Sequence, residues 1–245
     1  MTKLSLPPIF MLALCAGLAF PAYAGPPYIT DDPEPTDPGH WEIYNFVSGV
    51  HVPGTTAGAA GLDLNYGAAD DLQLTAVIPA GFDSRGQVGL GNIELAAKYR
   101  FLHQADGAAT PDMSFFPRLF VPTAARQFGT GRPNLLLPLW AEKDFGPWSL
   151  FGGGGYVINP GAGNRNYWTG GIVLSRTIDA DFSLGLEIYR QTPASPDSRT
   201  FTGLNIGASY RLSEHWSLIA SGGPGIQNET REGEYAFYGA LKADY

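Results

Sequence analysis

The chain has 245 residues, a formal net charge of −8, 32 glycines, 13% aromatic residues and only 16% charged residues. Many glycines and rings with few charges suit a β-protein rich in turns, and the acidic balance makes nucleic acid a poor partner. After residue 24, no run of about 18 apolar residues could form a membrane helix. Beyond residue 24, the longest stretch without a charged residue or a histidine, 145–164, holds seven glycines and two prolines, which a helix does not tolerate.

The first 24 residues have the features of a secretory signal peptide. Lys3 precedes an apolar run over residues 12–20, and Ala22-Tyr23-Ala24 forms an A-x-A cleavage pattern. The only cysteine, Cys15, lies inside this segment, and Leu14 stands where a lipoprotein signal would have a small residue. We therefore expect an exported chain, cleaved after Ala24, without a lipid anchor, thiol or disulfide.

Residues 25–40 form a segment rich in proline and acid. Five prolines alternate with Asp31, Asp32, Glu34 and Asp37, and this composition excludes a long helix or strand. We expect either a periplasmic leader or a short plug folded into a barrel mouth. Calcium binding by these acids is an alternative that would require the prolines to hold several oxygens around one point.

From residue 41 onward the chain alternates between polar and apolar residues in about twelve segments. Each is close to the nine to eleven residues that a tilted strand needs to cross a bilayer, and an even count returns both ends to the periplasm. The segments are 41–50, 57–67, 71–80, 92–102, 113–121, 134–144, 147–157, 166–177, 181–190, 200–212, 216–225 and 234–245. Residues 41–245 are therefore predicted to form an all-β domain, a transmembrane antiparallel up-and-down β-barrel of the bacterial outer membrane.

The connections support the same prediction. Short links at 68–70, 146, 179–180 and 213–215 alternate with longer ones at 81–91, 122–133, 158–165, 191–199 and 226–233. Short periplasmic turns and longer extracellular loops are typical of outer-membrane barrels, whereas a soluble sandwich has no reason to sort its loops. The link at 103–112 is longer than this rule expects.

The alternation also assigns the two faces of the wall. Leu72, Leu74, Ala76 and Ile78 share one face, which we assign to lipid because no charged group is tolerated there. Rings gather at the strand ends, as expected at the headgroup level. The last strand ends on Tyr245, and we expect the outer-membrane assembly machinery to engage this strand.

The opposite face is predicted to line the lumen and carries both charges and rings. The charges are Glu42, Asp63, Glu94, Lys98, Arg100, Arg118, Glu142, Glu187, Arg211, Lys242 and Asp244, and the rings are Tyr44, Phe46, Phe116, Phe120, Trp140, Phe151, Tyr189 and Tyr238. The near balance of acids and bases favours paired charges over a strongly ion-selective pore, and a static network that fills the barrel remains an alternative. The rings favour a path for apolar or aromatic solutes, with ordinary packing of a narrow barrel as the competing interpretation.

No catalytic or metal-binding motif stands out, so we expect no enzymatic activity, no cofactor and no metal site. The four histidines lie in or beside connections, without metal-ligand spacing. Ser213 and His215 are neighbours in a turn, which rarely form a nucleophile and its base. The glycines at 152–155 lack the lysine and helix of a phosphate loop and are interpreted as a thin strand.

Several motifs resemble the bacterial family known as MetA-pathway of phenol degradation. They are residues 26–35 (PPYITDDPEP) running into His40-Trp41-Glu42, residues 159–168 (NPGAGNRNYW), residues 185–188 (GLEI) and residues 191–193 (QTP). The resemblance implies an outer-membrane channel for hydrophobic or aromatic compounds, without established site residues.

The leading hypothesis is therefore a barrel in outer-membrane lipid that passes small apolar or aromatic solutes by facilitated diffusion. The rival hypothesis is a non-transporting barrel that is closed by its charge network and has a structural or loop-mediated binding role.

Overall fold

The computed structural model describes residues 26–105, 109–129 and 131–245, and the predicted signal peptide, residues 1–24, lies outside them. The strands are β1 (Trp41–Val52), β2 (Thr55–Ala69), β3 (Leu72–Asp83), β4 (Val88–Leu90), β5 (Ile93–Leu102), β6 (Asp112–Phe115), β7 (Arg118–Val121), β8 (Asn134–Phe145), β9 (Trp148–Ile158), β10 (Tyr167–Thr177), β11 (Phe182–Gln191), β12 (Phe201–Arg211), β13 (Trp216–Gln227) and β14 (Tyr235–Asp244), and α1 is Glu229–Glu232. Antiparallel pairing of β1 with β14 closes the sheet into a barrel.

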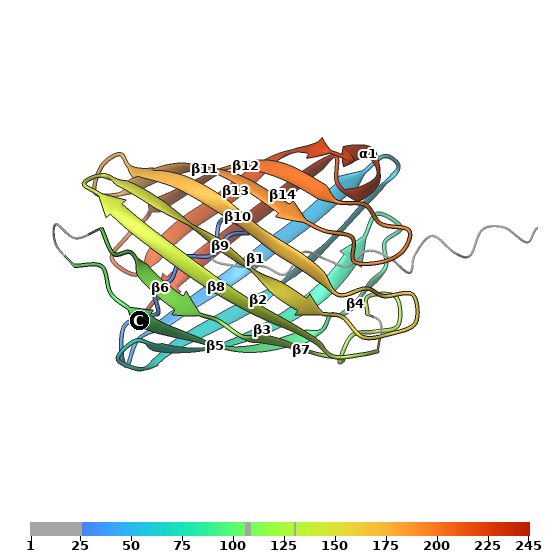
Figure 1. Cartoon of the computed structure of the whole chain (residues 1–245), viewed down its shortest axis with the longest axis horizontal. Coiled ribbons are helices and arrows are strands. Elements are labelled where there is room, and N and C mark those ends of the chain that lie inside the picture. Colours follow the sequence, from blue (N-terminus) through green and yellow to red (C-terminus); the bar gives the residue numbers. More distant parts are fainter. Residues whose placement is uncertain (1–25, 106–108, 130) are drawn as a thin grey trace, which may run out of the picture.

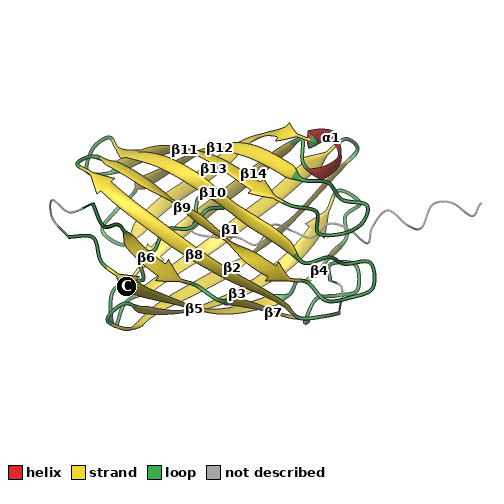
Figure 2. Cartoon of the chain, viewed as in Figure 1, coloured by secondary structure: helices red, strands yellow, loops and turns green. Residues whose placement is uncertain are grey.

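The wall consists of twelve strands, as predicted. β6 and β7 are two halves of one wall strand, since both pair with β5 on one side and with β8 on the other. The break falls at Pro117, which has no N–H to donate to a ladder. β4 and α1 are additions within connections predicted to be loops (Figure 2).

Most short connections lie at one end of the barrel and most long ones at the other, with the two-residue turn at 53–54 an exception at the long-loop end (Figure 1). Residues 70–71, 146–147, 178–181 and 212–215 make tight links at the end that holds the C-terminus, and Gly146 and Asp71 adopt the positive φ that such turns need. The link at 103–111 belongs to the same end and is the predicted exception. By the outer-membrane pattern this end is periplasmic.

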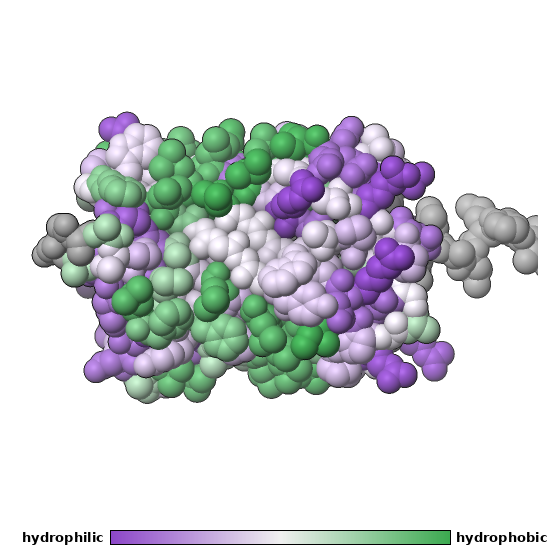
Figure 3. Space-filling model, viewed as in Figure 1, coloured by the Kyte–Doolittle hydropathy of each residue, from purple (hydrophilic) through white to green (hydrophobic). Residues whose placement is uncertain are grey.

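The outer surface is apolar, and the inner surface is polar and buried. In β11, Leu184, Leu186 and Ile188 are 42–55% exposed, whereas Glu187 is fully buried. A soluble protein would place these leucines inside, so hydrocarbon is the solvent that suits this wall. Figure 3 shows the apolar surface over most of the barrel's length and a hydrophilic surface at the end with the long loops. In the described part of the chain, no helix is long and apolar enough to cross a membrane.

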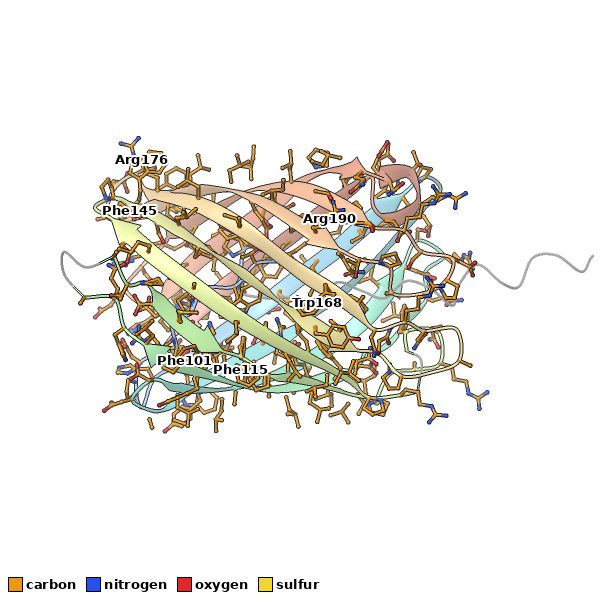
Figure 4. All side chains as sticks on the ribbon, in the orientation of Figure 1. Phe101, Phe115, Phe145, Trp168, Arg176 and Arg190 are labelled. Atoms are coloured by element: carbon orange, nitrogen blue, oxygen red, sulfur yellow. The ribbon has the colours of Figure 1, made fainter. Side chains whose placement is uncertain are left out.

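Exposed rings mark two levels of the wall. Near the periplasmic end, Trp41 packs on Tyr66 at 4.8 Å and Phe145 is 57% exposed. Toward the other end, Trp168 is 60% exposed and lies 5.1 Å from Tyr156. Figure 4 shows Phe145 and Trp168 toward these two ends of the wall. Such rings suit the two headgroup levels of a bilayer.

Candidate functional site in the barrel lumen

Residues 26–40 lie inside the barrel and contact the wall on many sides. Starting from β1, the chain forms a bridge between Pro38 and Gly67 and then runs up the lumen. The Thr36 amide donates to Gln73 Oε1 at 2.9 Å, and the Thr30 amide donates to Glu187 Oε1 at 2.6 Å. Because the prolines of this leader lack an N–H, few backbone donors enter the lumen without a partner.

The inner end of the leader packs against glycine residues of the wall. The Tyr28 hydroxyl donates to the Gly207 carbonyl at 3.1 Å, and its ring packs edge-on against Phe151 at 5.9 Å. A Cβ at Gly207 would overlap the Tyr28 ring, and a Cβ at Gly185 would overlap the Tyr28 hydroxyl oxygen. Glycines on β11 and β12 therefore form the cradle for this ring.

Lys98 is the main ionic contact between wall and leader. Its ammonium group lies 3.0 Å from Asp31 Oδ1, 3.4 Å from Asp32 Oδ1 and 3.1 Å from the Glu34 carbonyl oxygen. The Lys98 and Asp31 side chains are only 5% and 2% exposed. All three donors of the ammonium group are thereby used by the leader. The sequence contained one signal for this contact, the acid-rich composition of residues 25–40.

Two further charge clusters join residues that were predicted to face the lumen. Arg118 binds Glu94 through two hydrogen bonds of 2.6 and 2.9 Å, in a buried fork geometry. Lys242 lies 2.9 Å from both Glu42 and Asp244. The expectation that inward charges pair with one another therefore describes five of the eleven.

The remaining predicted charges have other neighbours. Glu187 accepts hydrogen bonds from the leader and from Asn205, Asp63 accepts from Asn65, and Glu142 accepts from Ser149. Arg211 is exposed at the periplasmic mouth.

Arg100 binds the carboxylate of Asp71 in a periplasmic turn. Its Nε donates to Asp71 Oδ1 at 3.0 Å, and His103 Nε2 lies 2.9 Å from the second carboxylate oxygen. Slight desolvation would raise the pKa of Asp71, but the hydrogen bonds from Arg100 and His103 outweigh it and hold that pKa below its usual value. The turn therefore keeps an ionised carboxylate that orients Arg100.

The predicted rings face inward, but most of their faces are occupied. Phe116 lies between Lys98, at 5.1 Å, and Arg118, at 5.4 Å. Phe46 stacks on Tyr238 at 6.2 Å. Four others form buried contacts: Phe120 with the cluster around Leu136, Trp140 with Phe116, and Tyr189 with Phe201 in the wall, and Phe151 with Tyr28 of the leader. Packing thus accounts for many of these rings.

A cavity of about 940 Å³ lies between the leader and the periplasmic mouth. Of the eight predicted rings, Tyr44 and Phe116 line it, joined by Trp41, Phe182 and Tyr245. Its volume is within the range of small-molecule sites. We call it the periplasmic chamber.

The charge of this chamber differs from the near balance predicted for the wall. Its acids are Asp31, Asp32, Glu34, Asp37, Glu42, Asp63, Glu94, Asp179, Asp181, Glu214 and Asp244, and its bases are Lys98, Arg118, Arg211 and Lys242. The excess of acid comes from the leader and the turns, which the count of wall charges left out. Such a concave surface has a negative potential that favours cations over anions.

His215 packs against the C-terminal residues of the chain. His215 Nδ1 lies 2.9 Å from the Asp244 carbonyl oxygen, and its ring stacks on Tyr245, so its hydrogen bond goes to Asp244 and not to Ser213. Among residues 26–105, 109–129 and 131–245, no group of three histidine, aspartate or glutamate side chains is arranged to hold a metal ion.

Comparison with known proteins gives one family and several solved structures with some similarity to this chain. The family model described as MetA-pathway of phenol degradation matches residues 24–241. The COG4313 outer membrane channel from Pseudomonas putida F1 has a TM-score of 0.68 and 16% identity, covering 87% of this chain and 98% of its own. The translocator domain of the autotransporter NalP from Neisseria meningitidis has a TM-score of 0.48 and 12% identity, covering 86% and 89% of the two chains. No curated protein matches the chain.

Proposed function

Because the chain belongs to the MetA-pathway of phenol degradation family and folds as a barrel of the bacterial outer membrane, we propose that it is a passive channel for small apolar or aromatic solutes. The observation that carries the proposal is the periplasmic chamber, which is bounded on its inner side by the leader. A leader is a separate segment that can move, whereas a wall strand cannot leave its ladder without breaking many hydrogen bonds.

The protein of similar fold from Pseudomonas putida F1 is an outer membrane channel, which agrees with this proposal. The rings of Tyr44 and Phe116 would provide weak contacts for an apolar solute, and weak binding permits release. Transport would follow the concentration gradient.

The test is uptake of an apolar fluorescent probe, N-phenyl-1-naphthylamine, by cells that carry the channel. We expect faster entry than in cells without it, and no increase in swelling of proteoliposomes in disaccharide. Phe116→Ala should change the entry rate about twofold or more because this ring lines the chamber. Phe101→Ala is the control, since Phe101 is 47% exposed on the outer wall. Equal entry with and without a folded channel would contradict the proposal.

A non-transporting barrel is the second candidate, and the filled lumen favours it. The leader is bonded to β3, β5, β11 and β12, and the buried Arg118–Glu94 pair braces the wall. Single-channel recording in a planar bilayer separates the two candidates. A folded protein that stays electrically silent, and that brings no probe into cells, would support the structural role.

A further inference from the structure

We propose that the extracellular end of the barrel binds the phosphate groups of the outer-leaflet glycolipid through a ring of arginines. This arginine collar consists of Arg85, Arg126, Arg132, Arg165, Arg190, Arg199 and Arg231, all of which are exposed. The inference depends on the outer-membrane location and not on the proposed transport.

The collar follows the connections of this end one by one. Each connection longer than two residues carries at least one arginine: Arg85 precedes β4, Arg126 and Arg132 lie between β7 and β8, Arg165 precedes β10, Arg199 precedes β12, and Arg231 lies in α1. The lysines of the described chain, Lys98, Lys143 and Lys242, belong to the other half of the barrel. The planar guanidinium group binds phosphate through two hydrogen bonds, which the lysine ammonium cannot do.

Among the carboxylates at the same end, which also include Asp197 and Glu229, three have contacts of their own. Asp83 accepts hydrogen bonds from the backbone amides of Arg85 and Gln87. Glu232 accepts one from the Arg199 backbone amide at 2.6 Å, and Glu234 lies 3.7 Å from His51.

Much of the collar has no internal counter-charge. Within the described chain, Arg126, Arg132, Arg165, Arg190, Arg199 and Arg231 form no ion pair with a carboxylate. In the periplasmic half, Lys98, Arg100, Arg118 and Lys242 are paired, whereas Arg176 and Arg211 form no ion pair with a carboxylate in the described chain. Unpaired guanidinium groups at one end are available to an external anion.

Arg190 connects the collar to the lipid-facing wall. It projects outward beside the buried, inward-facing Tyr189, and its Nη1 donates to Thr202 Oγ1 and Gln227 Oε1, each at 2.9 Å. Its cross-strand neighbour on β10 is Gly170, two residues from the outward-facing Trp168, so the two residues lie at similar levels of the wall, although the guanidinium group itself reaches over β12 and β13. Figure 4 shows both side chains toward the long-loop end of the barrel.

This arrangement suits a phosphorylated glycolipid. Trp168 marks the level at which acyl chains meet headgroups, and Arg190 adds a guanidinium group to the outer wall near that level, where headgroup phosphates would be. In Figure 3 the surface changes from apolar to hydrophilic toward this end. The occupant that fits is a lipid with a charged head, because its acyl chains would cover the apolar wall while its phosphates meet the exposed guanidinium groups at the end of that wall.

The experiment measures binding of bisphosphorylated lipid A to the purified, folded protein in neutral detergent by native mass spectrometry. We expect dephosphorylated lipid A to bind about tenfold more weakly or worse, because charge-assisted hydrogen bonds are lost. Binding of the bisphosphorylated form should weaken as salt rises. Equal binding of the two lipids would overturn the proposal.

The matched variants locate the site. Arg126→Gln, Arg132→Gln, Arg165→Gln and Arg190→Gln together should abolish the preference for phosphate. Arg176→Gln should leave it unchanged, because Arg176 is also exposed and outward but lies at the periplasmic end. If the fourfold variant does not fold, single Arg190→Gln and Arg190→Lys variants decide: both should bind more weakly, Arg190→Gln more so. An equal loss in Arg176→Gln, or no loss in any collar variant, would overturn the proposal.

Discussion

Lys98 joins the wall to the leader through a contact between residues 67 positions apart in the chain. Period-two alternation places its side chain inside the barrel, and the sequence allowed that prediction. The sequence did not predict that Lys98 binds Asp31, because alternation assigns the faces of strands and says nothing about a segment without regular structure. The same limit applies to Glu187, which accepts the Thr30 amide instead of binding a wall base.

Replacing Lys98 by methionine should release the leader. Asp31 would be left buried without a partner, which costs about 3–5 kcal/mol, and moving the leader out of the lumen avoids that cost. We expect larger or more frequent single-channel openings and faster cleavage of the leader by added protease.

The control for this change is Lys143→Met, which removes an ammonium group that donates to the Thr110 carbonyl oxygen. Adding Asp31→Asn to Lys98→Met should restore part of the closure, because the unpaired charge is gone. Openings and cleavage that are unchanged in Lys98→Met would show that this ion pair does not hold the leader.

At the scale of elements, the strands were the predictable part. Alternation and turn residues indicated twelve wall strands, and the structure confirms them within a few residues at each end. Pro117 within the fifth segment was visible, but the split into β6 and β7 depends on the hydrogen bonds of both neighbouring strands. The sequence does not decide whether residues 25–40 form a plug, since a proline-rich segment has no periodic alternation of polar and apolar residues.

The leader and the barrel should be separable elements. β1 pairs with β14 from Glu42 to His51, so the ladder closes without residues 26–38. Deleting those residues should leave a barrel that still folds, shown by heat-modifiable migration in gels, and should raise conductance several-fold. A glycine-serine segment of equal length is the control: it can occupy the lumen but cannot donate or accept as Tyr28 and Asp31 do. Unchanged conductance in a folded deletion variant would mean that the wall itself closes the lumen.

At the scale of the whole molecule, charge is divided between the two ends. Exposed arginines surround the extracellular end, and the excess of acid lies around the periplasmic chamber. The overall charge of −8 conceals this division. Only the closed barrel brings the leader and the periplasmic turns to one mouth, which is why counting inward wall charges predicted near balance.

This division predicts a preference for cations in the open channel. The acids of the chamber lower the free energy of a cation at the mouth and raise that of an anion, so a gradient of potassium chloride should give a reversal potential of the sign that cation selectivity requires. The preference should shrink toward 1 M salt, where the Debye length falls to about 3 Å.

Asp179→Asn with Asp181→Asn should reduce the preference for cations, because both residues line the chamber from one turn. Asp70→Asn is the matched control, since Asp70 lies in a turn of the same end but does not line the chamber. The leader-deleted barrel is the form to measure, because it still carries the acids of the turns and conducts without depending on the leader's movement. A reversal potential of zero or of the opposite sign would show that these acids do not set the potential along the path of ions.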